Sequence, residues 1–143
     1  MLTPLFIHQG PDPHHMDCSS FSCCLIYDSG LFDESKELPS FNTSGFQGAA
    51  AAWKPLLKPQ YDVIDFDIDG TTQIQSGDIL YFTAAEKGTT YGHAAVVYSA
   101  DNGVLMTLEI NTGKKENLKV LKRNHRKISE YNHVIRFVDK AQA

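Results

Sequence analysis

The segment GHAAVVYSADNGVLMTLEI occupies residues 92–110 and contains two apolar runs separated by the polar stretch SADNG. Apolar runs that flank a short stretch containing Asn-Gly are typical of a β-hairpin. A turn centred on Asp101 would place His93 opposite Glu109, on one face of adjacent antiparallel strands and with Cβ atoms about 5 Å apart. A change of one residue in the turn would move Glu109 to the other face.

Further apolar runs lie on both sides of this hairpin and indicate additional strands. In DVIDFDID at 62–69, apolar and acidic residues alternate, which is typical of a strand with one acidic face. The expected strands are 63–68, 79–82, 92–98, 104–110, 116–122 and 131–138.

Two helices are expected ahead of the strands. Residues 18–28 carry an apolar stripe at helical spacing, with Asp17 as the N-cap and Gly30 as a C-terminal stop. Residues 43–54 are rich in alanine, and Pro55 follows them as a helix terminator. Helices followed by five to six sequential strands predict an α+β domain with a mainly antiparallel sheet.

Length, charge and hydropathy limit the function classes. The 143 residues are expected to form one domain over 17–140, behind an irregular lead-in at 1–16. The formal net charge of -4 argues against nucleic acid as a partner. No apolar run approaches the ~20 residues of a membrane span. The first residues lack the pattern of a signal peptide, so we expect secretion or delivery to the periplasm or cell wall by another route.

Three cysteines, Cys18, Cys23 and Cys24, lie close together near the start of the chain. An odd, clustered set argues against a disulfide framework, and the adjacent pair has poor spacing for zinc. The sequence therefore predicts no metal site and no cofactor.

Cys18 follows directly after the expected helix N-cap. The positive end of the helix dipole favours a thiolate there, and the backbone N–H can face a developing oxyanion. Cys18 is therefore a candidate nucleophile. The alternative is a buried packing residue, which is the role expected of Cys23 and Cys24.

A cysteine nucleophile needs a base, and the base needs an orienting group. His93 is the candidate base because it opens an apolar strand after Gly92, where its side chain can point into a cleft. Glu109 and Asn111 share a face of the partner strand and are the candidate orienting groups, and Thr107 shares that face as a weaker candidate. The alternatives are a strand-end histidine bonded to a local carbonyl and a polar pair on a solvated face. The other histidines lie in the lead-in (His8, His14, His15), in a basic stretch (His125) or in the last strand (His133).

The segments that carry these candidates resemble the motifs of the NlpC/P60 superfamily of cysteine peptidases. MDCSSFSCCLIYDSGL resembles its DCSGF segment, SGDILYF its PGDLVFF strand, and YGHAAVVYSADNG its GHVGIY segment. LEIN at 108–111 is similar to the Glu-x-Asn group of the related CHAP amidases. TTYGHAAVV resembles the histidine segment of type VI secretion amidase effectors, and DCSS resembles phage peptidoglycan amidases. The motifs occur in order over residues 16–138, with Ser20 in place of the usual glycine.

The resemblance implies a papain-like fold, in which a cysteine-bearing helix packs on an antiparallel sheet, and cleavage of peptidoglycan amide bonds through a thioester. By position, Cys18 would be the nucleophile, His93 the base and then the acid, and Glu109 or Asn111 the orienting group. Asp78 matches the Gly-Asp of the motif and is expected to hold a loop. The residues expected at the substrate-binding surface are Asp17, Ser19, Ser20, Asp78, Tyr91 and Gly92.

Aromatic side chains are further candidates for lining a substrate groove. The candidates are Phe46, Trp53 and Tyr91, although the alanine-rich helix around Trp53 favours a place in the core for that residue.

The leading hypothesis is a cysteine amidase or endopeptidase that cuts peptidoglycan stem peptides. Such an enzyme would suit an antibacterial effector, with a neutralising immunity protein as partner, or a compact phage lysin. The alternatives are an inactive wall-peptide binding module on the same fold, and a transferase or deamidase that acts on protein or lipid.

Overall fold

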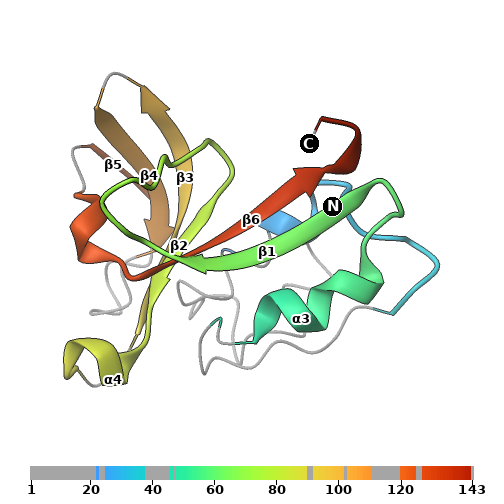
Figure 1. Cartoon of the computed structure of the whole chain (residues 1–143), viewed down its shortest axis with the longest axis horizontal. Coiled ribbons are helices and arrows are strands. Elements are labelled where there is room, and N and C mark those ends of the chain that lie inside the picture. The colour runs from blue at the N-terminus through green and yellow to red at the C-terminus, as the bar shows by residue number, and fades with distance from the viewer. Residues whose placement is uncertain are drawn as a thin grey trace.

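The computed structural model describes residues 22, 25–37, 46, 48–89, 92–101, 103–110, 120–124 and 127–142. Its centre is a six-stranded sheet in the order β1-β6-β2-β3-β4-β5, and all neighbouring strands are antiparallel (Figure 1). The strands are β1 Tyr61–Asp67, β2 Ile79–Phe82, β3 His93–Asp101, β4 Val104–Ile110, β5 Val120–Asn124 and β6 His133–Asp139. The α-helices are α3 Ala49–Trp53 and α4 Ala84–Lys87, and the 3₁₀ turns are η2 Lys54–Leu56, η4 Ile128–Glu130 and η5 Lys140–Gln142. The expected α+β class with an antiparallel sheet is confirmed.

The observed strands follow the expected ones closely. β2 and β4 have the expected bounds, and the described part of β5, Val120–Asn124, overlaps the strand expected at 116–122. β3 continues to Asp101, where a turn was expected. The hydrophobic pattern therefore locates the strands well, and the turns less well.

The described part of the second expected helix is shorter than predicted. α3 begins at Ala49, and a 3₁₀ turn continues the chain from Lys54 to Leu56 with Pro55 inside it. Proline is tolerated there because the first turn of a helix needs no N–H donor at that position. Of the first expected helix, residue 22 and residues 25–27 are helical.

The centre of the sheet is buried on both faces. Ile79 and Ala94 enter a core on the side of α3, whereas Leu80 and Ala95 enter a second core on the opposite face. Because both faces are covered, β2 and β3 read as continuous apolar runs and not as alternating ones.

Aromatic rings fill the core beside α3. Trp53 packs edge-on to Phe46 and stacks on Phe137 of β6. Only 1% of Phe46 and of Trp53 is exposed. The expected core position of Trp53 is confirmed, and the interpretation of Phe46 as a groove residue is wrong because its side chain is buried against Trp53 and Tyr81.

The turn of the β3–β4 hairpin lies between Asp101 and Val104, which pair with each other. The predicted centre at Asp101 is therefore wrong. Farther from the tip, a β-bulge shifts the register so that Val97 pairs with Thr107, and Tyr98 is the extra residue.

The bulge decides which way Glu109 points. Continued without a bulge, the register of the tip would place Glu109 opposite Val96, which packs against the core beside α3. The observed register ends with Val96 opposite Leu108, and extending it by one residue places Glu109 opposite Ala95, on the face that also carries His93. The expected shared face is correct, but Glu109 reaches His93 diagonally and not from directly across.

Candidate active site

His93 and Glu109 contact each other directly. His93 Nε2 lies 2.8 Å from Oε1 of Glu109. The histidine side chain is 17% exposed and the carboxylate side chain only 2%. A buried carboxylate on one ring nitrogen fixes the orientation of the imidazole, which is the arrangement a histidine base requires.

Thr107 holds the other oxygen of the same carboxylate. Its hydroxyl donates a hydrogen bond of 2.7 Å to Oε2 of Glu109. Thr107 and Glu109 share a face because alternate residues of β4 point the same way. Strand periodicity therefore identifies Thr107 as a neighbour, whereas its contact with Oε2 depends on rotamers that the sequence does not encode.

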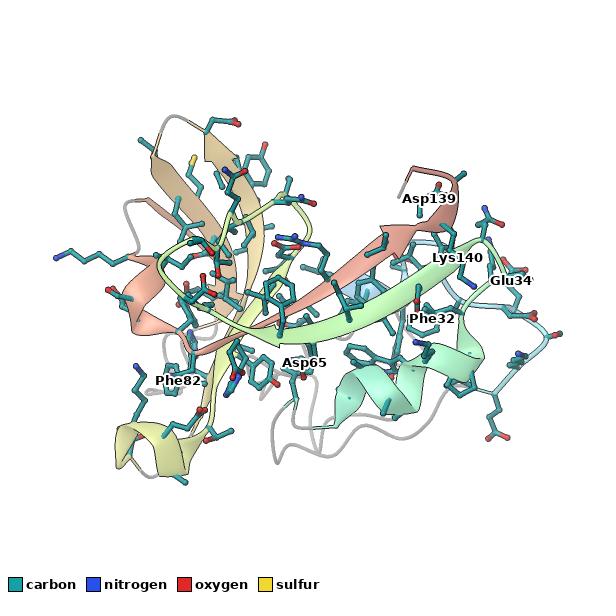
Figure 2. All side chains as sticks on the ribbon, in the orientation of Figure 1. Phe32, Glu34, Asp65, Phe82, Asp139 and Lys140 are labelled. Atoms are coloured by element: carbon teal, nitrogen blue, oxygen red, sulfur yellow. The ribbon has the colours of Figure 1, made fainter. Side chains whose placement is uncertain are left out.

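Two aromatic rings lie beside the imidazole. The centroid of Phe82 is 6.2 Å from that of His93, and the ring of Tyr131 stacks on it at 6.4 Å. Phe82 lies beside α4, at the end of the molecule away from Phe32 (Figure 2). The sequence prediction did not include Phe82 or Tyr131, because their approach depends on the sheet order.

Gly92 brings the start of β3 against the end of β2. A Cβ atom at Gly92 would lie 2.5 Å from the carbonyl oxygen of Phe82 and 3.4 Å from the backbone nitrogen of Ala84. Phe82 pairs with His93 in the sheet. The missing side chain therefore allows the close backbone approach that positions His93.

Asp78 forms an ion pair that ties a loop to the sheet. Its two carboxylate oxygens accept hydrogen bonds from Nε and Nη2 of Arg136 at 2.9 and 2.8 Å, and one also accepts from the backbone of Gln75. The hydrogen bond to Asp78 raises the pKa of Arg136. Asp78 is 2% exposed. Its described contacts are those of a carboxylate that holds the loop before β2.

His133 lies between two carboxylates on the other face of the sheet from His93. Its Nδ1 is 2.8 Å from Asp67, and its Nε2 is 2.7 Å from Glu86 of α4. Partial burial lowers the pKa of His133, but the hydrogen bonds to Asp67 and Glu86 outweigh burial and raise it overall. His133 has the contacts of a structural bridge between β1, β6 and α4.

The ring of Tyr81 packs against His133 with centroids 4.8 Å apart. The Tyr81 hydroxyl donates to Asp65 over 2.6 Å. Burial, with the hydrogen bond to Asp65, raises the pKa of Tyr81 well above its ordinary value. Burial also raises the pKa of Asp65. Tyr81 therefore contacts both His133 and Asp65, on the face of the sheet that carries α3.

Several predicted site residues lie outside the described part of the chain, and for these the assignments stay predictions. They are Asp17, Cys18, Ser19, Ser20, Tyr91 and Asn111. The described residues bring together His93, Glu109 and Gly92, and they place Asp78 in its ion pair with Arg136.

Within the ranges described, no group of three or more His, Cys, Asp and Glu side chains is arranged to hold a metal ion. The helices described there are also too short or too polar to cross a bilayer.

No protein-family model matches the chain, and no curated protein matches it. The solved structures that are similar include two of Ly7917. The crystal structure of Ly7917 has a TM-score of 0.44 and 19% identity, covering 83% of this chain and 52% of that one. The crystal structure of Ly7917 with the hydrolyzing product of MDP has a TM-score of 0.49 and 17% identity, covering 92% of this chain and 59% of that one. This chain thus spans less than two thirds of their length.

Proposed function

We propose that this chain is a cysteine amidase or endopeptidase that hydrolyses amide bonds in peptidoglycan stem peptides. Cys18 is the nucleophile, His93 the general base and acid, and Glu109 the orienting group, with Asn111 as the alternative orienting group. The observation that carries the proposal is the 2.8 Å contact between Nε2 of His93 and the buried carboxylate of Glu109.

This contact supports one defined tautomer of the proposed base, His93. A carboxylate at Nε2 favours the tautomer in which Nε2 carries the proton and Nδ1 carries the lone pair. The same carboxylate stabilises the imidazolium that forms when Nδ1 accepts a proton. Nδ1 is therefore the atom proposed to face the thiol of Cys18.

The proposed reaction has two halves. Nδ1 of His93 removes the thiol proton of Cys18, and the thiolate forms a bond to the amide carbonyl carbon. The C–N bond then breaks, the imidazolium protonates the departing amine, and a thioester remains. A water molecule that loses a proton to His93 attacks the thioester carbon, which releases a carboxylic acid and restores the thiol.

Digestion of purified sacculi tests the proposal. We expect the parent protein to release soluble fragments whose masses reveal a newly formed amine and carboxylate. Cys18→Ala should lower the rate more than about 10³-fold, since the loss of a nucleophile removes the covalent route. Cys24→Ala serves as the matched control and should remain active. Release of fragments by Cys18→Ala at the parental rate would refute the assignment.

Iodoacetamide labelling separates the enzyme from the binding-module alternative. A thiolate nucleophile should label at Cys18 much faster than at Cys23 or Cys24 in mildly acidic buffer. Equally slow labelling of all three, together with retention on sacculi without fragment release, would favour a wall-peptide binding module. Intact sacculi without retention would instead favour a transferase or deamidase that acts on protein or lipid.

The site of action follows from the proposed substrate. A peptidoglycan hydrolase works in the periplasm or at the cell wall, and an antibacterial effector of this kind would have an immunity protein that covers its active site.

A further inference from the structure

We propose that Thr107 is a positioning residue for the active-site histidine and acts through the carboxylate of Glu109. This role deepens the proposed function and rests on it. Thr107 has no assigned role in the reaction proposed above, where Glu109 is the orienting group.

The geometry forms a chain of three side chains. Thr107 Oγ1 donates to Oε2 of Glu109 over 2.7 Å, and Oε1 of the same carboxylate lies 2.8 Å from Nε2 of His93. A carboxylate held at both oxygens has a fixed rotation about its last bond, so Oε1 keeps one position relative to the ring. The imidazole plane, and with it the direction of Nδ1, then depends on the threonine hydroxyl.

The surroundings argue against a packing role alone. Thr107 is fully buried, pairs with Val97, and lies on the face that carries the second core. Valine has the same shape and would avoid the cost of burying a hydroxyl in apolar surroundings. A hydroxyl at this position is favourable because its hydrogen bond is made to a charged acceptor, which strengthens it.

The threonine also limits the motion of a buried acid. Glu109 reaches His93 diagonally, from a position opposite Ala95, so its side chain must lean along the strand. The hydroxyl of Thr107 lies two residues back on the same face and holds the far oxygen in that leaning arrangement. Removing the hydroxyl takes away one of the contacts that fix the carboxylate, and we expect the imidazole to lose its single orientation as a result.

Nitrogen NMR of the His93 ring tests this role in Thr107→Val and Thr107→Ser, with the signals assigned through a His93→Gln sample. In the parent and in Thr107→Ser, we expect the Nε2–H tautomer and one common titration midpoint. In Thr107→Val, we expect a mixture of tautomers and a displaced midpoint. Thr107→Ala takes the place of the valine variant if circular dichroism shows that Thr107→Val does not fold.

Two results would overturn the role. One is a parental tautomer and midpoint in the variant that lacks the hydroxyl. The other is an equal disturbance in Thr107→Ser, because this variant keeps the hydroxyl and loses only a methyl group. Either outcome would make Thr107 a packing residue.

Alkylation of Cys18 by iodoacetamide gives a functional readout. We expect Thr107→Val to slow it about tenfold, the size of effect that outer partners of metal-bound histidines commonly have, and Thr107→Ser to react as the parent does. The ring-nitrogen spectra can also be recorded in a Cys18→Ala background. Failure of the positioning role is therefore seen in the spectra, whereas failure of the proposed function is seen in the sacculus digestion.

Discussion

Gly92 shows how a single missing side chain supports the site. Gly92→Ala would insert a Cβ atom 2.5 Å from the backbone oxygen of Phe82, and backbone cannot yield as a flexible side chain does. We expect about 1–3 kcal/mol of lost stability, the usual cost of overpacking, together with a displaced His93. Urea unfolding measures the first effect and the His93 ring spectra the second.

Gly70→Ala is the matched control for this prediction. No atom lies within 4 Å of a Cβ built at Gly70. The control should retain parental stability and spectra. Equal behaviour of the two alanine variants would contradict the close-approach explanation for Gly92.

At the same scale, the residues differ in how well the sequence predicts them. His93 and Glu109 are predictable as candidate residues because a polar residue in an apolar strand is conspicuous. The contact of Thr107 with Oε2 is not predictable, because it depends on two side-chain rotamers. The place of Cys18 beside His93 stays a prediction, because residue 18 lies outside the described ranges.

At the scale of elements, the hairpin shows why register is harder to predict than strand position. The predicted turn is wrong, and a tight turn alone would have sent Glu109 to the other face. A bulge at Tyr98 compensates by one residue, so the predicted face of Glu109 is correct for a reason that the sequence pattern does not contain. A bulge depends on contacts with segments distant in sequence. Here the hydroxyl of Ser76, in the loop before β2, donates a hydrogen bond to the carbonyl of the bulged residue Tyr98.

The ion pair of Asp78 with Arg136 is one of the contacts that hold the loop before β2. Asp78→Ala would leave Arg136, whose side chain is 18% exposed, without the carboxylate that binds it at two nitrogens. Breaking a buried pair on one side typically costs about 3–5 kcal/mol, and we expect a loss of that size in urea unfolding. Asp101→Ala, at an exposed carboxylate of the hairpin tip, should change stability by less than about 0.5 kcal/mol. If Asp78→Ala loses as little unfolding free energy as Asp101→Ala, the ion pair of Asp78 with Arg136 does not stabilise the fold.

At the scale of the whole molecule, the fold class is predictable and the packing is not. The spacing of hydrophobic residues along the sequence distinguishes strands from helices. Short links between successive strands favour antiparallel neighbours. The sheet order places β6 between β1 and β2, so the last strand of the chain joins the first two. Nothing in the local pattern encodes that insertion, which is why the contacts of Arg136 with Asp78 and of His133 with Asp67 become visible only in the structure.

These contacts made by β6 predict how global stability depends on pH. The folded-state pKa of His133 is raised above its ordinary value of 6.5, so its contribution is fully present below pH 6.5 and is lost as the pH rises through the folded pKa. Glu86 acts in the opposite sense. Its backbone hydrogen bond with Thr83, supported by His133, lowers its pKa below 4.5, so its contribution is lost as the pH falls through that lower folded pKa.

We therefore expect the free energy of unfolding of the parent to exceed that of His133→Gln by the largest amount between pH 4.5 and 6.5. The difference should shrink above pH 6.5, because the parent loses the imidazolium while the glutamine variant has no charge to lose. Urea unfolding of both proteins in a series of buffers measures this difference directly, and the other histidines cancel because the two chains share them. Two parallel profiles across this range would mean that His133 does not join β1, β6 and α4 through its charge.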